Sequence, residues 1–483
     1  MDENRKNLIE SISKIIEKSK ENYLDVLRDL VKIPSVSAWE DPEPRHEVAS
    51  YIVKKMENVG ISSKILEGFD KDYPIVLAMS PQHVQPPRRG MESLNKRRII
   101  LFMGHLDVQP PGDLDKWKEN PDPFNPIVKE GRIYGRGILD TKAQVAAQIC
   151  ALMLLNELSL PPRPLDFIFT TDEEIGSQKS TLDFFKTQEK LYKPINPYIG
   201  AINGENSGER VVLGCKGIIK VKFTARDPLG RGHSGKSMFH QHHPILNLSN
   251  FFSKIREKSE ILHDGLNTLN PPVRIIEDLE EGSDEFEKID GEIILPINGL
   301  KIALGKEIWN HLVSQGWNVA DIGKKFASIS FNPDNFLSGT SESQTIVPDE
   351  AISEVDLRLP PKVDPGKVIN ILEEEVDYHP HINMEVLMPS SPEHYRYFQG
   401  AFTSPYHRFV KSFVITCSNI QGKKPVIMPF SSGTSDDRFL EALHVPHVKF
   451  GAIGKNNHGY DEWVSISSYL NVIKIYSLMM IQQ

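Results

Sequence analysis

Apolar residues recur at helical spacing in two segments near the start of the chain, which predicts helices over residues 5–32 and 46–59. The first pattern stops before Pro34 and the second at Gly60, and both residue types favour the end of a helix. Continuous apolar runs then predict buried strands over 73–79, 98–103, 165–170 and 445–450, with a long apolar helix over 141–158. Because such strands alternate with helices, we predict an α/β fold with a doubly wound, mainly parallel catalytic sheet.

The pattern changes between residues 213 and 392, where strand-like segments surround one helical segment. Strands are expected over 217–225, 327–330 and 351–359, and a helix over 244–262. We interpret this region as a smaller α+β lid or dimerisation domain, inserted into a catalytic domain formed by residues 1–212 and 393–483. The Pro- and Arg-containing segment 81–96 and the acidic segment 277–292 are expected to be solvated loops.

Composition adds few constraints on function. The chain has 483 residues and a net charge of -9, and no dense basic cluster indicates a nucleic-acid partner. Its first ten residues are rich in charged side chains and contain no long apolar stretch, which gives no reason to expect a membrane partner or a secretion signal. Three widely spaced cysteines without CxxC spacing favour a cytoplasmic protein.

Five short segments contain side chains that suit a divalent metal ion. They read GHLD, GRGILDTK, DEEIGS, NGEN and NNHGY, and they supply His105, Asp140, Glu174, Glu205 and His458 as candidate ligands. Two imidazoles and three carboxylates are the ligand types that two neighbouring Zn²⁺-type ions prefer. The additional carboxylate of Glu173, adjacent to Glu174, could serve as a general base in hydrolysis.

Each segment also has an ordinary structural interpretation. His105 and Asp107 end a predicted strand, where Asp107 could orient a metal-bound imidazole or simply cap a turn. Asp140 could be a helix cap instead of a bridging ligand, while Glu205 and the Glu173–Glu174 pair could be exposed turn acids. The agreement of all five segments favours a two-metal hydrolase over independent structural roles.

In their order and spacing, these segments resemble the co-catalytic zinc peptidase family that includes carnosinase-type dipeptidases, carboxypeptidase G, aminoacylase and succinyl-diaminopimelate desuccinylase. The resemblance extends from the IPSVS segment at 33–37 to His458. It implies that His105, Asp140 and Glu205 hold one metal, and that Asp140, Glu174 and His458 hold the other. Glu173 would be the general base and Asp107 would orient His105.

The resemblance also covers the inserted region. GHSGK implies that His233 stabilises the oxyanion, in dimeric members at the active site of the partner subunit. The segment QTIVPDEAISEVDLRLP implies that Arg358 binds the substrate carboxylate with Thr345 as a neighbouring contact. FSSGTSD matches a substrate loop that contains Ser432 and Gly433. On its chemistry alone, His233 is one of several histidines in a His-rich surface segment.

Together these features predict a dimetal amidohydrolase that cleaves dipeptides or C-terminal residues, as a homodimer with Zn²⁺, Mn²⁺ or Co²⁺. The alternative is an N-acyl-amino-acid deacylase that uses the same site, and a third hypothesis is a metal-stabilised scaffold without activity. Two positions depart from the family pattern: Thr141 stands where many members have an acid, and Glu205 leaves the substrate class open. The length of the insert favours a dipeptidase, whereas the sequence of the substrate loop argues against a dipeptidase.

Overall fold

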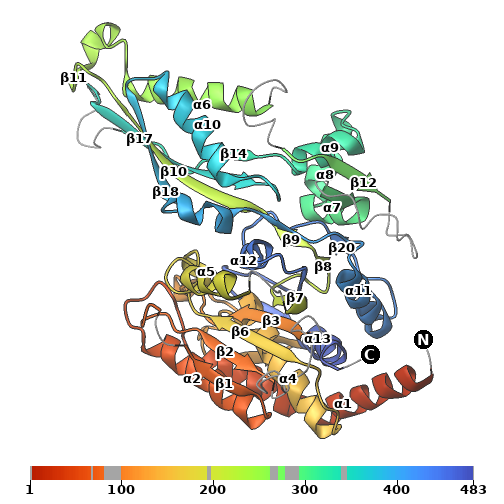
Figure 1. Ribbon diagram of the computed structural model, residues 1–483. Helices are drawn as coiled ribbons and strands as arrows, with labels where there is room; N and C mark the ends of the chain where they lie inside the picture. The colour runs from red at the N-terminus through yellow and green to blue at the C-terminus, as the bar shows by residue number, and fades with distance from the viewer. Residues whose placement is uncertain are drawn as a thin grey trace. The chain divides into compact units, whose positions relative to one another are not determined.

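The computed structural model describes residues 3–66, 69–80, 99–192, 197–260, 270–277, 293–338 and 345–481. The predicted loop 81–96 and nearly all of the acidic segment 277–292 therefore lie outside the described residues. The chain divides into two compact units (Figure 1). Unit 1 comprises residues 1–213, 403–428 and 439–483, and unit 2 comprises 214–402 and 429–438.

The core of unit 1 is an eight-stranded sheet in the order β1-β2-β6-β3-β7-β21-β8-β20. Its four inner strands, β6, β3, β7 and β21, are parallel, while antiparallel pairs occur toward both edges. The predicted doubly wound α/β sheet is therefore confirmed as a mixed sheet with a parallel centre. The bounds are β1 (Ser62–Ile65), β2 (Val76–Met79), β3 (Ile99–His105), β6 (Leu165–Thr170), β7 (Tyr198–Gly204), β8 (Val211–Val212), β20 (Ile427–Met428) and β21 (His447–Phe450).

Helices cover this sheet because its strands are apolar on both faces. Every residue of β3 and β6 is buried, as expected for strands at the centre of a covered parallel sheet. Helix α4 packs on β3 and against α1 and α13, and α2 packs on β1 and β2. The helices outside the insert are α1 (Glu3–Lys32), α2 (Glu43–Asn58), α4 (Ala143–Glu157), α5 (Thr181–Tyr192), α11 (Arg408–Gln421), α12 (Asp437–Ala442) and α13 (Ile466–Met479).

The segment Ile138–Glu157 is apolar and long enough to cross a membrane by length and composition alone. Within its most apolar stretch of 18 residues, 94% is buried inside the structure, as expected for the central helix of a folded core.

A separate four-stranded antiparallel sheet in the order β22-β23-β5-β4 completes unit 1. Its strands are β4 (Ile127–Lys129), β5 (Arg132–Tyr134), β22 (Gly454–Lys455) and β23 (Trp463–Ser465).

Unit 2 is an α+β structure built on two long antiparallel strands, β10 (Gly217–Arg226) and β17 (Glu350–Leu359), which pair over their full length. Alternate residues of both strands face a hydrophobic core, to which α6 (Pro244–Glu260) and α10 (Pro365–Asp377) contribute. The same sheet contains β14 (Ser330–Pro333), β15 (Leu337–Ser338) and β18 (Ile382–Met388).

The smaller elements of unit 2 include three consecutive helices that the sequence pattern did not reveal. The strand predicted over 327–330 is wrong, because α9 ends at Phe326 and the strand begins only at Ser330. These elements are β9 (Gly214–Cys215), β11 (Gly232–His233), β12 (Val273–Ile276), β13 (Ile293–Pro296), α7 (Ile297–Leu304), α8 (Lys306–Ser314), α9 (Val319–Phe326), β16 (Ile346–Val347) and β19 (Ala401–Phe402).

Two segments predicted with the catalytic domain, 393–402 and 429–438, pack with unit 2 instead. The catalytic and lid or dimerisation roles of the two parts stay predictions.

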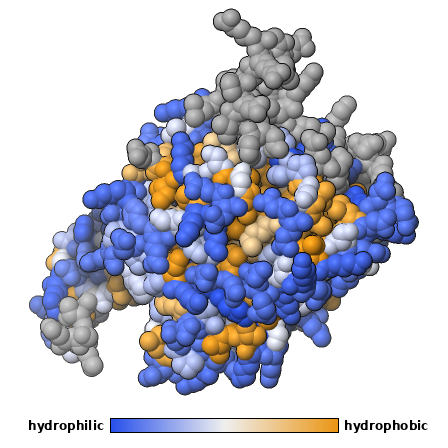
Figure 2. All heavy atoms as spheres, turned by 90° about the horizontal axis from the view of Figure 1, so that it is seen from below, coloured by the Kyte–Doolittle hydropathy of each residue, from blue (hydrophilic) through white to orange (hydrophobic). Residues whose placement is uncertain are grey.

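On the face shown in Figure 2, hydrophobic residues lie among hydrophilic ones. All three cysteines are buried and free.

Candidate metal centre

Three of the predicted site segments follow neighbouring parallel strands in unit 1. His105 is the last residue of β3, Glu173 and Glu174 follow β6, and Glu205 follows β7. Adjacent parallel strands lie about 4.8 Å apart, so residues at their carboxyl ends are brought to one edge of the sheet. The register pairs His105 with Thr170 on β6 and Met103 with Asn203 on β7, which places Glu205 level with His105.

Asp140 reaches the same edge from the turn Ile138–Lys142, which connects to the start of α4. Gly137 precedes it with φ 72°, and a Cβ there would lie 2.1 Å from the side chain of Val108, so only glycine suits this position. The Asp140–Thr141 peptide bond is cis. The Thr141 hydroxyl donates to the carbonyl oxygen of His105 at 2.9 Å, which connects the turn to β3.

The Asp140 carboxylate presents one oxygen to each of two imidazoles. Its Oδ1 lies 3.3 Å from Nε2 of His105, and its Oδ2 lies 3.1 Å from Nε2 of His458. Oε2 of Glu174 lies 3.0 Å from the same His458 nitrogen. One ligand atom from each of His105, Asp140 and Glu174 lies within 4.8 Å of the other two, which makes this group a candidate metal site.

His458 comes from an unexpected element. It lies in the hairpin between β22 and β23 of the small sheet, and not directly beyond the predicted strand 445–450. Its φ is 60°, and Asn456 and Asp461 in the same hairpin also have positive φ values. Such backbone conformations cost free energy for residues other than glycine and are found where a loop must hold a functional side chain.

The charges at this edge are strongly coupled. Burial alone would raise the pKa of Asp140, but hydrogen bonds with His105 and His458 lower it below its ordinary value. Hydrogen bonds with Asp140 and Glu174 raise the pKa of His458 to about 10. Burial alone would lower the pKa of His105. Hydrogen bonds with Asp107 and Asp140 and the charge of Glu173 nevertheless raise this pKa well above its ordinary value. Any cation would therefore compete with protons for both imidazoles.

Asp107 is fully buried and contacts both sides of the cluster. Its Oδ1 lies 3.5 Å from Nδ1 of His105, while its own backbone oxygen is closer to that nitrogen, at 3.0 Å. The carboxylate also accepts the backbone N–H groups of Glu173 at 3.3 Å and Glu174 at 3.0 Å. Asp107 thus holds the Glu173–Glu174 turn as well as facing His105, which its position in the sequence did not suggest.

The third acid of the DEE run does not belong to the cluster. Asp172 accepts backbone N–H groups of Lys179, Ser180 and Thr181 and contacts the Thr181 hydroxyl at the start of α5. These bonds fix the turn that carries Glu173 and Glu174.

Four further residues support the cluster and were not singled out from the sequence. Gln109 donates to the Glu174 carboxylate at 2.9 Å, and Asn457 donates to Oδ2 of Asp140 at 3.3 Å. The other two, Arg136 and Glu462, form a buried ion pair beside the Asp140 turn. Arg136 is part of the GRG segment, but the sequence offered no signal that pairs it with Glu462.

The remaining predicted residues lie in unit 2. His233 is exposed, its Nδ1 accepts the N–H of Gly235, and β11 and β16 place it beside exposed Thr345. Arg358 lies on β17, where its guanidinium contacts Asp356 and Thr434. Ser432 and Gly433 are exposed in the loop that also contains Thr434.

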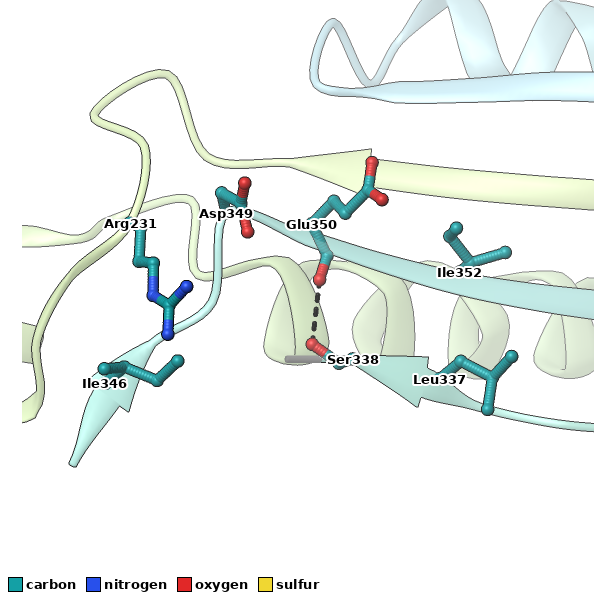
Figure 3. A pocket seen from close by; sticks show the side chains of 7 residues that line it. All are labelled: Arg231, Leu337, Ser338, Ile346, Asp349, Glu350 and Ile352. Carbon is teal, nitrogen blue, oxygen red and sulfur yellow. Dashed lines mark hydrogen bonds between the residues drawn. The ribbon is translucent and has the colours of Figure 1, made fainter. Parts of the chain in front are cut away.

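A cavity of about 230 Å³ also lies in unit 2 (Figure 3). The Ser338 hydroxyl beside it donates to the backbone oxygen of Glu350 at 2.8 Å. None of the predicted site residues lines this cavity. Its lining consists of Arg231, Leu337, Ser338, Ile346, Asp349, Glu350 and Ile352.

Comparison with known proteins gives a consistent family assignment. The model for peptidase family M20/M25/M40 matches residues 101–482. The chain is 23% identical over 475 residues to a succinyl-diaminopimelate desuccinylase of Pelagibacter ubique, covering 94% of this chain and 97% of the relative. It is also 23% identical over 507 residues to the Cys-Gly metallodipeptidase dug1 of Schizosaccharomyces pombe, covering 97% of both proteins.

A solved structure supports the fold independently. The M20 family metallo-carboxypeptidase of Sulfolobus solfataricus superposes with a TM-score of 0.69 at 24% sequence identity. The match covers 95% of this chain and 98% of that protein. The resemblance inferred from the five short segments is therefore confirmed at the level of the family and of the fold.

Proposed function

The chain belongs to peptidase family M20/M25/M40, and we propose that it is a metal-dependent hydrolase of dipeptides or of C-terminal residues of peptides. The observation that carries this proposal is the Asp140 carboxylate, whose two oxygens face His105 and His458 separately. A carboxylate between two imidazoles suits the bridging position between two cations. The similarity to the S. pombe dipeptidase over 97% of the chain supports the choice of substrate.

The donor set suits two ions of the Zn²⁺ type, with Mn²⁺ or Co²⁺ as alternatives. His105, Asp140 and Glu205 would hold one ion, and Asp140, Glu174 and His458 the other. When bound there, such ions would lower the pKa of a water molecule and polarise the carbonyl group of the scissile amide. Gln109 and Asn457 would keep the Glu174 and Asp140 carboxylates in place.

Glu173 is proposed as the general base. Its charge acts on His105, its backbone is held by Asp107, and its side chain is only partly buried. Its carboxylate would take a proton from the attacking water as the new C–O bond forms. It would then give that proton to the amide nitrogen as the C–N bond breaks, which releases a free amine and a carboxylate.

Substrate contacts are proposed for unit 2. Arg358, Thr345, Ser432 and Gly433 would contact the substrate, and His233 would donate to the developing oxyanion. We propose that His233 acts in the active site of the partner subunit of a homodimer. Several large apolar side chains close to His233 in sequence, among them Leu229, Met238 and Phe239, are 64–75% exposed, which supports association through this region. The mass of the protein in solution tests this proposal.

The second candidate function is deacylation of N-acyl amino acids at the same site. It is supported by the similarity to the P. ubique desuccinylase, which covers 97% of that protein. We also propose a cytoplasmic location, which agrees with three cysteines that remain free thiols.

A substrate panel distinguishes these functions. The purified protein, supplied with Zn²⁺, Mn²⁺ or Co²⁺, would be incubated with dipeptides and with N-acetyl and N-succinyl amino acids. Release of free amino acids from dipeptides supports the first function, and release from acylated amino acids supports the second. A metal-loaded, folded protein that hydrolyses neither class would contradict both and would favour a metal-stabilised scaffold.

A further inference from the structure

Lys216 is a buried lysine between β9 and β10 of unit 2. It is only 8% exposed. Its Nζ lies 3.4 Å from the carbonyl oxygen of Ser328 and 5.4 Å from the centre of the Phe326 ring. None of the described residues offers it a carboxylate within ion-pair distance. Buried cations are normally paired, so this one requires an explanation.

Arg358 lies on the same face of the sheet as Lys216. Ile218 stands directly opposite Arg358 in the antiparallel pair of β10 and β17, and Lys216 precedes Ile218 by two positions. The two positive charges influence each other, because burial together with the charge of Arg358 lowers the pKa of Lys216 to about 8.

The charge of Arg358 is already compensated within the chain. Its Nε and Nη2 donate to the two carboxylate oxygens of Asp356, at 2.7 and 2.8 Å, in a bidentate pair. Its Nη1 donates to the hydroxyl of Thr434 at 3.1 Å. The uncompensated positive charge at this place therefore belongs to Lys216 and not to Arg358.

The substrate loop also reaches this place. The backbone N–H of Lys216 donates to the carbonyl oxygen of Ser431 at 3.1 Å, and Ser431 in turn donates its N–H to Gly214. The next two residues, Ser432 and Gly433, are exposed. Lys216, Arg358 and the exposed loop are thus fixed beside one another within unit 2.

We propose that Lys216 supplies the charge that selects substrates with a free carboxylate, while Arg358 acts as a hydrogen-bond donor whose orientation Asp356 and Thr434 fix. This inference rests on the proposed function, because it takes the carboxylate of a peptide or N-acyl amino acid as the anion. It assigns Lys216 to specificity and not to the chemical step.

The test compares each acid substrate with its C-terminal carboxamide in the wild type, Lys216→Met and Lys216→Arg. A hydrogen bond to a charged group is worth about 1.5–3 kcal/mol, which corresponds to roughly 10- to 150-fold in affinity. We expect Lys216→Met to raise KM for the acid by roughly this factor and to leave the carboxamide nearly unaffected. Lys216→Arg should restore part of the preference.

A matched control is Lys222→Met. Lys222 lies on β10, the strand that follows Lys216, but it has its own ion-pair partner in Glu385, and its loss should not change the preference for the acid. An equal loss of kcat on acid and carboxamide in Lys216→Met would indicate a structural role and overturn the proposal. So would an unchanged preference for the acid.

A binding measurement tests the role of Lys216 independently of the proposed function. Calorimetry with N-acetyl-leucine and its carboxamide needs no turnover. If no substrate is hydrolysed but the wild type binds the acid more tightly and Lys216→Met does not, the proposed reaction fails and the role of Lys216 stands. Equal binding of acid and carboxamide by the wild type would overturn the role of Lys216.

Discussion

Nη1 of Arg136 donates to the carboxylate of Glu462 at 2.6 Å, with both side chains almost completely buried. The Glu462 carboxylate also accepts the backbone N–H groups of Gly137, Leu139 and Asp140, at 2.8–3.1 Å. Nη2 of Arg136 donates to the carbonyl oxygens of His458 and Gly459. This ion pair therefore connects the turn that carries Asp140 to the hairpin that carries His458.

Glu462→Gln should weaken both the fold and the site. It leaves the buried guanidinium of Arg136 without its counter-charge, which typically costs about 3–5 kcal/mol. Denaturant unfolding measures this loss, and metal titration should show weaker binding because the Asp140 turn loses one of the two acceptor oxygens that anchor it. As a control, Asp25→Asn removes an exposed partner of Arg28 and should cost less than about 1 kcal/mol. Unchanged stability and metal affinity in Glu462→Gln would contradict this role.

Glu173→Ala should retain the metal ions and lose turnover. A general base contributes about 10²- to 10⁴-fold to the rate, and Glu173 is not among the proposed ligands. The measurement is kcat together with the metal content of the same sample. Asp183→Asn, at an exposed acid on α5, is the control and should behave like the wild type. Retained turnover in Glu173→Ala would remove Glu173 from the mechanism.

Asp107→Asn should lower kcat and metal affinity by about 10- to 100-fold. The amide has one acceptor oxygen, whereas the carboxylate accepts two backbone N–H groups and also faces His105. Kinetics and metal titration report the two effects separately. Full activity would indicate that the backbone oxygen of Asp107 is sufficient to orient the imidazole.

Metal binding should release protons and strengthen as the pH rises. Without a cation, the neighbouring carboxylates raise the pKa of His458 to about 10, so its imidazole holds a proton at neutral pH. A metal ion must displace that proton, so the metal affinity should fall about tenfold for each unit by which the pH is lowered, for each proton released. Calorimetry in buffers of different ionisation enthalpy measures the number of protons released on metal binding. Affinity independent of pH between 6 and 8 would contradict this coupling.

The sequence predicts best what depends on local patterns. The buried strands β3 and β6 were expected almost at their observed bounds, because uninterrupted apolar runs end at His105 and at the acids after Thr170. Strand β7 was missed, although it is the strand that positions Glu205. The short helices α7, α8 and α9 were also missed, since each is too short to show a clear period.

Long-range partners could not be derived from the sequence. Asp140 and Glu462 are 322 residues apart, and no local spacing indicates that one accepts the backbone N–H of the other. The sequence also did not reveal that His458 lies in a hairpin, because a two-residue strand such as β22 leaves almost no pattern of apolar and polar positions.

The metal content of the reconstituted protein tests the central claim most directly. Wild-type protein dialysed against Zn²⁺ and then against buffer should hold two ions per chain by elemental analysis. Asp140→Ala, which removes both oxygens of the shared carboxylate, should lose them together. A wild type that binds no Zn²⁺, or an Asp140→Ala variant that still holds two ions, would contradict the account.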